Sequence, residues 1–126
     1  MDHLALGRLG EEEAVRYLVE GGWKILGRNV RHGRGEVDII AASGEVVAFV
    51  EVKTRSCLDH GHPLEAITWS KRREIARVAR GWIQGQADLR GKLFRFDAVS
   101  VIWSGKKPAE IIHVPNAWSL GWNPLA

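Results

Sequence analysis

The chain has 126 residues, 45% of them hydrophobic, and a formal net charge of +3 at pH 7. We expect one domain over residues 1–126, because this length supports a single core and is too short for two. No segment has the roughly 18 to 20 continuous apolar residues of a membrane span, and the first residues lack the pattern of a signal peptide. These absences predict a cytoplasmic protein without a membrane partner.

Two helices and five strands are predicted from the hydrophobic spacing. Gly21–Gly22 is a typical helix terminator, and Ser43–Gly44 is a turn signal between two β-rich segments. In chain order the expected elements are a helix over residues 4–20, strands over 23–31, 35–41 and 45–54, a helix over 70–86 that begins at 64 at the earliest, and strands over 94–103 and 109–114. The order α-β-β-β-α-β-β predicts an α/β fold in which helices flank a mixed sheet.

The third expected strand carries charges at the end of a buried run. Residues 46–50 are continuously apolar, as in a strand covered on both faces, and Glu51 and Lys53 continue the strand. Alternation places Glu51 and Lys53 on one face. The two-residue turn before this strand places Asp38 opposite Phe49 and diagonal to Glu51. We therefore expect Asp38, Glu51 and Lys53 to converge.

These three residues suit a metal-dependent hydrolysis. The carboxylates of Asp38 and Glu51 and the backbone carbonyl of Val52 are hard oxygen ligands of the kind that Mg²⁺ or Mn²⁺ binds. Such an ion neutralises phosphate charge, and Lys53 can hold or deprotonate the attacking water. The set predicts phosphodiester hydrolysis. The alternative is that Glu51 and Lys53 form an ordinary ion pair at a solvated strand end, with Asp38 in a turn.

A fourth carboxylate comes from the first expected helix. On a helical wheel Glu11 falls at the centre of the apolar stripe, whereas Glu12 and Glu13 fall outside it. The members of this stripe are Leu4, Gly7, Ala14, Val15 and Leu18. A carboxylate aimed at the core needs a metal, a cation or a polar cavity, so we expect Glu11 to join the same site.

Four motifs together resemble a known family. "GRLGEEEAVRYL", "RNVRHGRGEVDIIA", "FVEVKTR" and "RFDAVSV" resemble, in this order, the YraN family of uncharacterised bacterial proteins. That family is similar to archaeal Holliday-junction resolvases and to the restriction-endonuclease-like PD-(D/E)xK nucleases. The resemblance spans about residues 7–118 and implies a restriction-endonuclease-like fold.

The resemblance also implies roles for single residues. Glu11 is the acidic residue of the helix, Asp38 and Glu51 are the metal ligands, and Lys53 is the catalytic lysine. The proline that usually precedes the aspartate is replaced by Val37. Asp97 matches a residue of the family pattern, for which we expect a strand-end ion pair with Arg95 or Arg55.

Basic residues cluster in "GRNVRHGRG" and "SKRREIARVAR", which favours an anionic partner such as nucleic acid. In the second helix Arg73, Arg77 and Arg80 line either a phosphate-tracking stripe or a solvated face, and Lys71 falls on the inward side. The expected nucleic-acid-binding residues are Arg31, Arg34, Arg55, Lys71, Arg73 and Arg77.

Histidine and tryptophan residues give weaker signals. His60 and His62 form an H-x-H that can bind a transition metal, but no third and fourth ligands accompany it at a sensible spacing. Tryptophans are expected mainly in the core, and the candidates for base stacking are Trp69, Trp118 and Trp122.

The function that we expect is that of a Mg²⁺-dependent nuclease acting on DNA, including branched or structured DNA. One alternative is a nucleic-acid-binding module of the same fold that does not cleave. Another is a subunit that works through protein partners, with its charged residues serving only structure. A junction-cutting enzyme needs two sites and therefore a two-fold homodimer.

Overall fold

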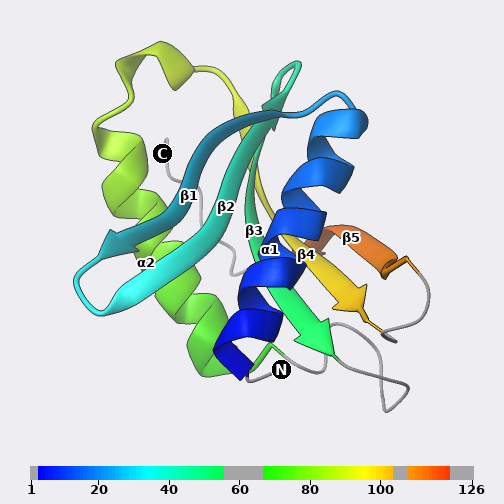
Figure 1. Cartoon of the computed structure of the whole chain (residues 1–126). Helices are drawn as coiled ribbons and strands as arrows, with labels where there is room; N and C mark the ends of the chain where they lie inside the picture. Colours follow the sequence, from blue (N-terminus) through cyan, green and yellow to red (C-terminus); the bar gives the residue numbers. More distant parts are fainter. Residues whose placement is uncertain (1–2, 56–66, 104–107, 120–126) are drawn as a thin grey trace.

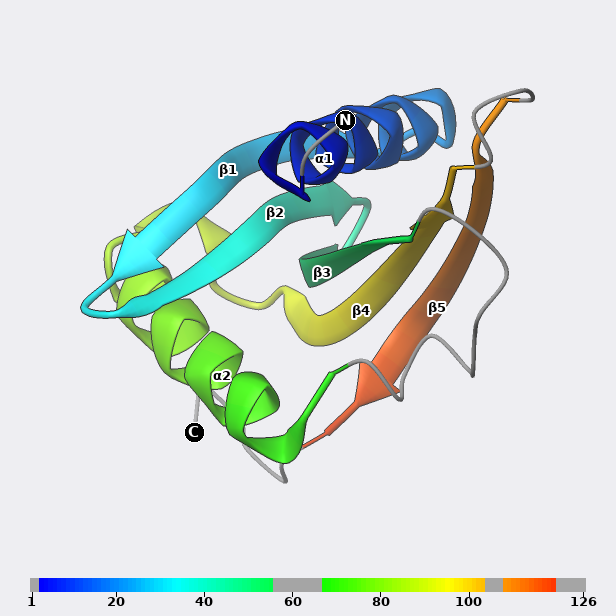
Figure 2. The same ribbon diagram turned by 60° about the horizontal axis from the view of Figure 1, so that its bottom comes forward.

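A computed structural model describes residues 3–55, 67–103 and 108–119. In chain order its elements are α1 (His3–Glu20), β1 (Lys24–His32), β2 (Gly35–Ser43), β3 (Val46–Arg55), α2 (Trp69–Gln84), the 3-10 helix η2 (Ala87–Leu89), β4 (Leu93–Ile102) and β5 (Glu110–Trp118). The five strands form one sheet in the order β1-β2-β3-β4-β5, and α1 and α2 cover its opposite faces (Figures 1 and 2). The predicted α/β order is confirmed, and only the short η2 was not expected.

The sheet is mixed. Strands β1, β2 and β3 pair antiparallel, β3 and β4 pair parallel, and β4 and β5 pair antiparallel. The parallel pair requires a crossover, and the connection from β3 to β4 contains α2. Among the described residues, no helix is long and apolar enough to cross a membrane.

The apolar run of β3 is unbroken because helices cover both of its faces. Val47 and Phe49 belong to the core on the α2 face, whereas Ala48 and Val50 belong to the core on the α1 face. Each fully buried side chain as large as valine or phenylalanine stabilises the fold by roughly 1.5 to 3 kcal/mol. β3 is thus the central strand. Glu51 and Lys53, which follow its buried run, are attached to a well-packed part of the sheet.

The apolar stripe predicted for α1 is only partly correct. Ala14 and Leu18 are buried, and Val15 packs against the same core. Leu4 is 73% exposed, and a Cβ at Gly7 would have no atom within 4 Å. The first turns of α1 therefore do not contribute to the core, a feature that helical spacing alone cannot predict.

The turn between β2 and β3 lies one residue later than expected. Ser43 pairs with Val46, so that Gly44 and Glu45 form the turn, and Gly44 has a φ of +57° that glycine adopts without strain. Phe49 consequently faces Ile40, and the prediction that it faces Asp38 is wrong. The error amounts to two residues in register, which does not exchange the faces of the paired residues of β2 and β3.

The helix and strand ends follow local signals with small shifts. Thr68 caps α2, because its Oγ1 accepts a hydrogen bond from the backbone N–H of Lys71 at 3.1 Å. The helix ends at Gln84, two residues before the expected end. β5 runs to Trp118, four residues beyond the expected end, and includes an irregularity at Asn116, whose φ is +50°.

Candidate active site

The site begins where β2 and β3 separate. Their last paired residues are Ile39 and Val50. Beyond this pair, the side chain of Asp38 bonds to the backbone of β3 where a backbone–backbone hydrogen bond would otherwise follow. Its Oδ2 accepts a hydrogen bond from the backbone N–H of Val52 at 2.7 Å. This bond holds the Asp38 carboxylate against β3 at the level of Glu51.

Glu51 is a buried carboxylate with an unsatisfied oxygen. The residue is only 4% exposed, and its Oε2 has no hydrogen-bond partner among the described residues. The pKa of neighbouring Asp38 is raised to about 8, first by burial and then by a hydrogen bond with Glu51 and its like charge. Two close, poorly solvated carboxylates of this kind favour a bound proton or a cation.

Lys71 of α2 is the cation nearest to Glu51 among the described ion pairs. Its Nζ lies 3.8 Å from Glu51 Oε2 and 2.9 Å from Glu74 Oε2. Burial acts to lower the pKa of Lys71, but the bond to Glu74 and the charge of Glu51 raise it above its usual value. The inward position predicted for Lys71 is confirmed. Glu74 was not predicted, although its place three residues after Lys71 was a usable signal.

Lys53 takes the face of β3 that alternation predicts. It lies two residues after Glu51, is half-buried, and stands beside Ser100 of β4 in the parallel register. Within residues 3–55, 67–103 and 108–119, no ion pair joins Lys53 to Glu51. Asp38 lies inside β2 rather than in a turn, so the alternative of an ordinary strand-end ion pair does not describe this geometry.

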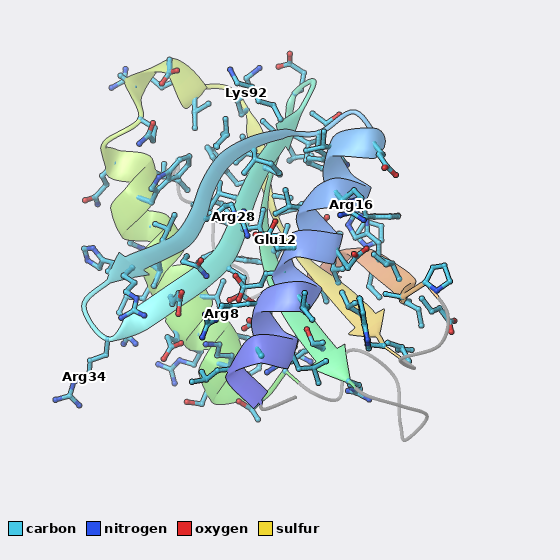
Figure 3. All side chains as sticks on the ribbon, in the orientation of Figure 1. Arg8, Glu12, Arg16, Arg28, Arg34 and Lys92 are labelled. Carbon is cyan, nitrogen blue, oxygen red and sulfur yellow. The ribbon has the colours of Figure 1, made fainter. Side chains whose placement is uncertain are left out.

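Glu11 of α1 lies close enough to Asp38 to be affected by its charge, but its hydrogen bond is to another residue. Its Oε1 accepts a hydrogen bond from Asn29 Nδ2 of β1 at 2.8 Å. The pKa of Glu11 is raised first by burial, with further contributions from the charges of Asp38 and Glu36. Asn29 has a φ of +49°, and no pattern in the sequence predicted its role. The adjacent Glu12 is exposed and its Oε1 accepts a hydrogen bond from Arg28 Nη2 of β1 at 2.6 Å. Figure 3 labels both residues.

The arrangement offers two carboxylates to a divalent ion. The described residues contain no group of three or more His, Cys, Asp or Glu side chains placed to hold a metal. The candidate ligands are therefore Asp38 and Glu51 with the carbonyl of Val52, a donor set that suits Mg²⁺, which retains several waters in its shell. The unsatisfied Glu51 Oε2 fits such an ion.

Asp97 belongs to a different cluster on the α1 face. Its carboxylate accepts hydrogen bonds from Arg95 Nε at 2.9 Å and from Asn116 N–H at 2.9 Å, and it lies 2.8 Å from His113 Nε2. Burial acts to raise the pKa of Asp97, but the bonds to His113, Arg95 and Asn116 lower it. The predicted pair with Arg95 is confirmed, although it lies in the middle of β4 rather than at its end. Asp97 joins β4 to the irregular part of β5.

Most of the predicted basic residues lie on α2 or the β1–β2 hairpin. Arg73 and Arg77 are exposed, Arg31 is 4.0 Å from Glu36, and Arg34 projects from the hairpin tip in Figure 3. Arg55 is half-buried at the end of β3.

Two glycines let the hairpin pack closely on α2. A Cβ at Gly35 would approach Val78 Cγ2 to 2.7 Å, and one at Gly81 would approach the His32 ring to 2.8 Å. These contacts hold the tip of the hairpin beside α2.

The predicted stacking residues differ in their exposure. Trp69 is 60% exposed, whereas Trp118 is 6% exposed and stacks on Phe96 with ring centroids 5.3 Å apart. The prediction that a base could stack on Trp118 is therefore wrong, because β5 extends to Trp118 and its ring is buried. Trp122 and the pair His60 and His62 lie outside the described residues.

Comparison with known proteins supplies the family. Residues 10–101 match the uncharacterised protein family UPF0102. The chain belongs to this family. UPF0102 is the YraN family that the motifs resemble.

Relatives match over nearly their full length. A UPF0102 protein of Geobacter metallireducens is 43% identical over 118 residues, which cover 94% of this chain and 95% of that protein. A UPF0102 protein of Rhodococcus opacus is 44% identical over 116 residues, covering 92% and 98%. One from Caldicellulosiruptor saccharolyticus is 47% identical over 106 residues, covering 84% and 89%.

The UPF0102 match includes the whole candidate site. It begins one residue before Glu11 and contains Asp38, Glu51, Lys53 and Lys71, whereas β5 lies beyond it. The relatives carry the family name and no stated activity. The function of this UPF0102 chain must therefore be argued from its site.

Proposed function

We propose that this UPF0102 protein is a Mg²⁺- or Mn²⁺-dependent nuclease that hydrolyses phosphodiester bonds of DNA. The observation that carries the proposal is the partly buried Asp38 beside the buried Glu51, whose Oε2 has no hydrogen-bond partner in the described part of the chain. A buried carboxylate oxygen without a hydrogen bond destabilises the fold by about 1 to 3 kcal/mol or more, and the Lys71 ammonium at 3.8 Å offsets this only in part. A divalent ion between the two carboxylates would remove that penalty.

Each residue then has a chemical task. Asp38 and Glu51, with the carbonyl of Val52, hold the ion, which supplies charge neutralisation at the phosphate and lowers the pKa of a bound water. Lys53, on the same face of β3, would hold the attacking water and stabilise the negative charge that builds at the phosphorus centre. Lys71, 3.8 Å from Glu51, offsets the carboxylate charge and faces the incoming phosphate. Glu11 borders the site from α1.

The resemblance to Holliday-junction resolvases extends the proposal to branched DNA. Cutting both strands of a junction requires two sites, so the active form would be a two-fold homodimer.

A second candidate function is a DNA-binding module without cleavage. It is favoured by the absence of a third acidic ligand among the described residues and by the ion pairs that Lys71 makes with Glu51 and Glu74. A role of the charges in structure alone is disfavoured, because Glu51 Oε2 makes no hydrogen bond with a described residue.

A cleavage assay separates these functions. Wild-type protein with Mg²⁺ or Mn²⁺ is incubated with single-stranded, duplex, flap and four-way-junction DNA, and we expect it to cut at least one. Asp38→Asn and Lys53→Ala should each slow cutting by roughly 100-fold or more. Glu13→Gln is the control, since Glu13 pairs with Arg16 of the same helix at 3.3 Å and is not among the candidate site residues. Binding without cutting by wild type would establish the binding module, and equal rates for wild type and Asp38→Asn would refute the assigned site.

A further inference from the structure

The outer side of α2 contains a small hollow close to the candidate active site. It encloses about 240 Å³ and is lined by Trp69, Ser70, Arg73, Glu74 and Arg77. Trp69, Arg73 and Arg77 are spaced four residues apart and so follow one another along a single stripe of the helix. The volume is below the roughly 300 to 1,000 Å³ of sites for drug-sized molecules, so the hollow suits one ring system.

Trp69 offers an accessible aromatic surface. It is 60% exposed, whereas the other tryptophans in the described ranges are buried or half-buried. The cap formed by Thr68 makes Trp69 the first residue of α2 and so defines its position on the helix. An indole held in this way can stack on a planar ring from another molecule.

The charge in the hollow is positive. Arg73 and Arg77 are exposed and make no ion pair or hydrogen bond with any described residue. Glu74, the acid among the lining residues, is bound to Lys71 at 2.9 Å. Two guanidinium groups beside an aromatic surface match a phosphate backbone that carries a base.

The hollow is connected to the candidate active site by two contacts. Glu74 contacts Lys71, and Lys71 Nζ lies 3.8 Å from Glu51 Oε2. A strand bound along the stripe therefore passes next to the acidic site. This observation links the hollow to the same substrate.

We propose that the hollow binds one unpaired nucleotide of the DNA strand that enters the active site. Its base stacks on Trp69, and the phosphates on either side contact Arg73 and Arg77. The inference rests on the proposed nuclease function and specifies its substrate class, which is DNA with an unpaired nucleotide beside the cleaved bond. Intact duplex is disfavoured, because its bases already stack on one another and offer no free face.

Binding measured without metal tests this inference separately from cleavage. Fluorescein-labelled duplexes with a blunt end, a three-nucleotide overhang, or an abasic overhang of the same length are titrated in buffer containing EDTA. The abasic overhang keeps the phosphates and lacks the bases. Wild type should bind the normal overhang roughly 5- to 150-fold more tightly than the abasic one, as expected for stacking on one aromatic ring.

Variants identify the residue responsible. Trp69→Ala should reduce the preference for the normal overhang to less than twofold, and Trp69→Phe should keep most of it. Leu93→Ala is the matched control, because Leu93 is 62% exposed and pairs with Val46 at the start of β3, away from Glu51. Arg73→Ala should weaken binding to all three duplexes by a similar factor and reduce the slope of log affinity against log salt by about 1.

The outcomes distinguish the two proposals. An unchanged preference in Trp69→Ala, or an equal loss in Leu93→Ala, overturns the role of the hollow and leaves the nuclease proposal intact. Failure of wild type to bind any of these DNAs, together with no cutting in the presence of Mg²⁺ or Mn²⁺, overturns both.

Discussion

At the scale of single residues, the buried charges of this protein follow two opposite patterns. Asp97 is fully buried and its carboxylate is satisfied by Arg95, His113 and Asn116. Glu51 is almost as buried, but its Oε2 has no hydrogen-bond partner in the described ranges. A satisfied carboxylate contributes to stability, whereas an unsatisfied one indicates a site that requires a ligand.

Glu51→Gln should therefore stabilise the protein in the absence of metal. The substitution keeps the shape and removes a buried negative charge beside Asp38, so we expect a gain of about 1 to 2 kcal/mol in the free energy of unfolding in EDTA. Wild type should in turn gain about 1.4 kcal/mol when Mn²⁺ is present at ten times its dissociation constant, and the variant should not.

Thermal unfolding with EDTA and with Mn²⁺ measures both effects, with Glu13→Gln as the control. A Glu51→Gln protein that is less stable than wild type in EDTA would contradict the assignment of Glu51 as a buried charge that Lys71, at 3.8 Å, offsets only in part.

Asp97→Asn should be destabilising, and its cost should depend on pH. The pKa of Asp97 in the folded protein lies below its ordinary value of 3.8, so its ionised form contributes stability above that pH, and this contribution is lost as the pH falls through the lowered pKa. At pH 7 we expect a loss of about 2 to 4 kcal/mol, somewhat below the value for a fully buried ion pair because Arg95 is 23% exposed.

Urea unfolding of wild type and Asp97→Asn between pH 7 and pH 2.5 tests this prediction. The difference in unfolding free energy between the two proteins should shrink below pH 3.8. A difference that stays constant over this range would show that the charge of Asp97 is not the stabilising feature.

At the scale of elements, α1 approaches β3 most closely at one glycine. A Cβ at Gly10 would overlap Thr54 Oγ1, whereas a Cβ at Gly7, one turn earlier, would contact nothing within 4 Å. Helix propensity favours alanine over glycine at both positions by about 1 kcal/mol. Only at Gly10 does packing oppose that preference. Comparing alanine substitutions at the two positions therefore distinguishes the effect of packing on stability from the effect of helix propensity.

Gly7→Ala should raise the free energy of unfolding by up to about 1 kcal/mol. Gly10→Ala should lower it by roughly 1 to 3 kcal/mol, because α1 or Thr54 must shift. Chemical denaturation of the two variants measures this contrast. An equal gain in both would mean that α1 does not pack on β3 at Gly10.

At the scale of the whole molecule, the charge of +3 and the exposed arginines around α2 favour a nucleic-acid partner. The resemblance to junction resolvases adds an expectation about assembly, because one chain carries one Asp38–Glu51 pair and a junction presents two strands to be cut.

We expect two protomers to bind one four-way junction. Asp38→Asn protein is mixed with a junction in Mg²⁺, and the mass of the complex is measured by light scattering, with a duplex of equal length as the control. A complex of one protomer per junction, for a wild-type protein that cuts both strands, would contradict the dimer.

The sequence by itself determined the elements and the faces of their side chains. Alternation along β3 correctly placed Glu51 and Lys53 on one face, and Asp38 lies beside Glu51 as predicted although the turn was placed one residue too early. The faces were predicted correctly because side chains alternate with a period of two residues, so an error of two residues in register does not change the face on which a side chain lies. The pairing of Asp97 with Arg95 was predictable for the same reason, since they lie two residues apart on one strand.

Only the tertiary structure decided which elements meet at the site. Lys71 reaches Glu51, and Glu74 binds Lys71, because α2 packs on the face of the sheet to which Glu51 points. Asn29 holds Glu11 because β1 passes beside α1. Local periodicity specifies the direction of a side chain relative to its own element, but contacts between elements depend on sheet order, crossover and packing. The same reason explains why the wheel of α1 predicted its face and not the exposure of its first turn.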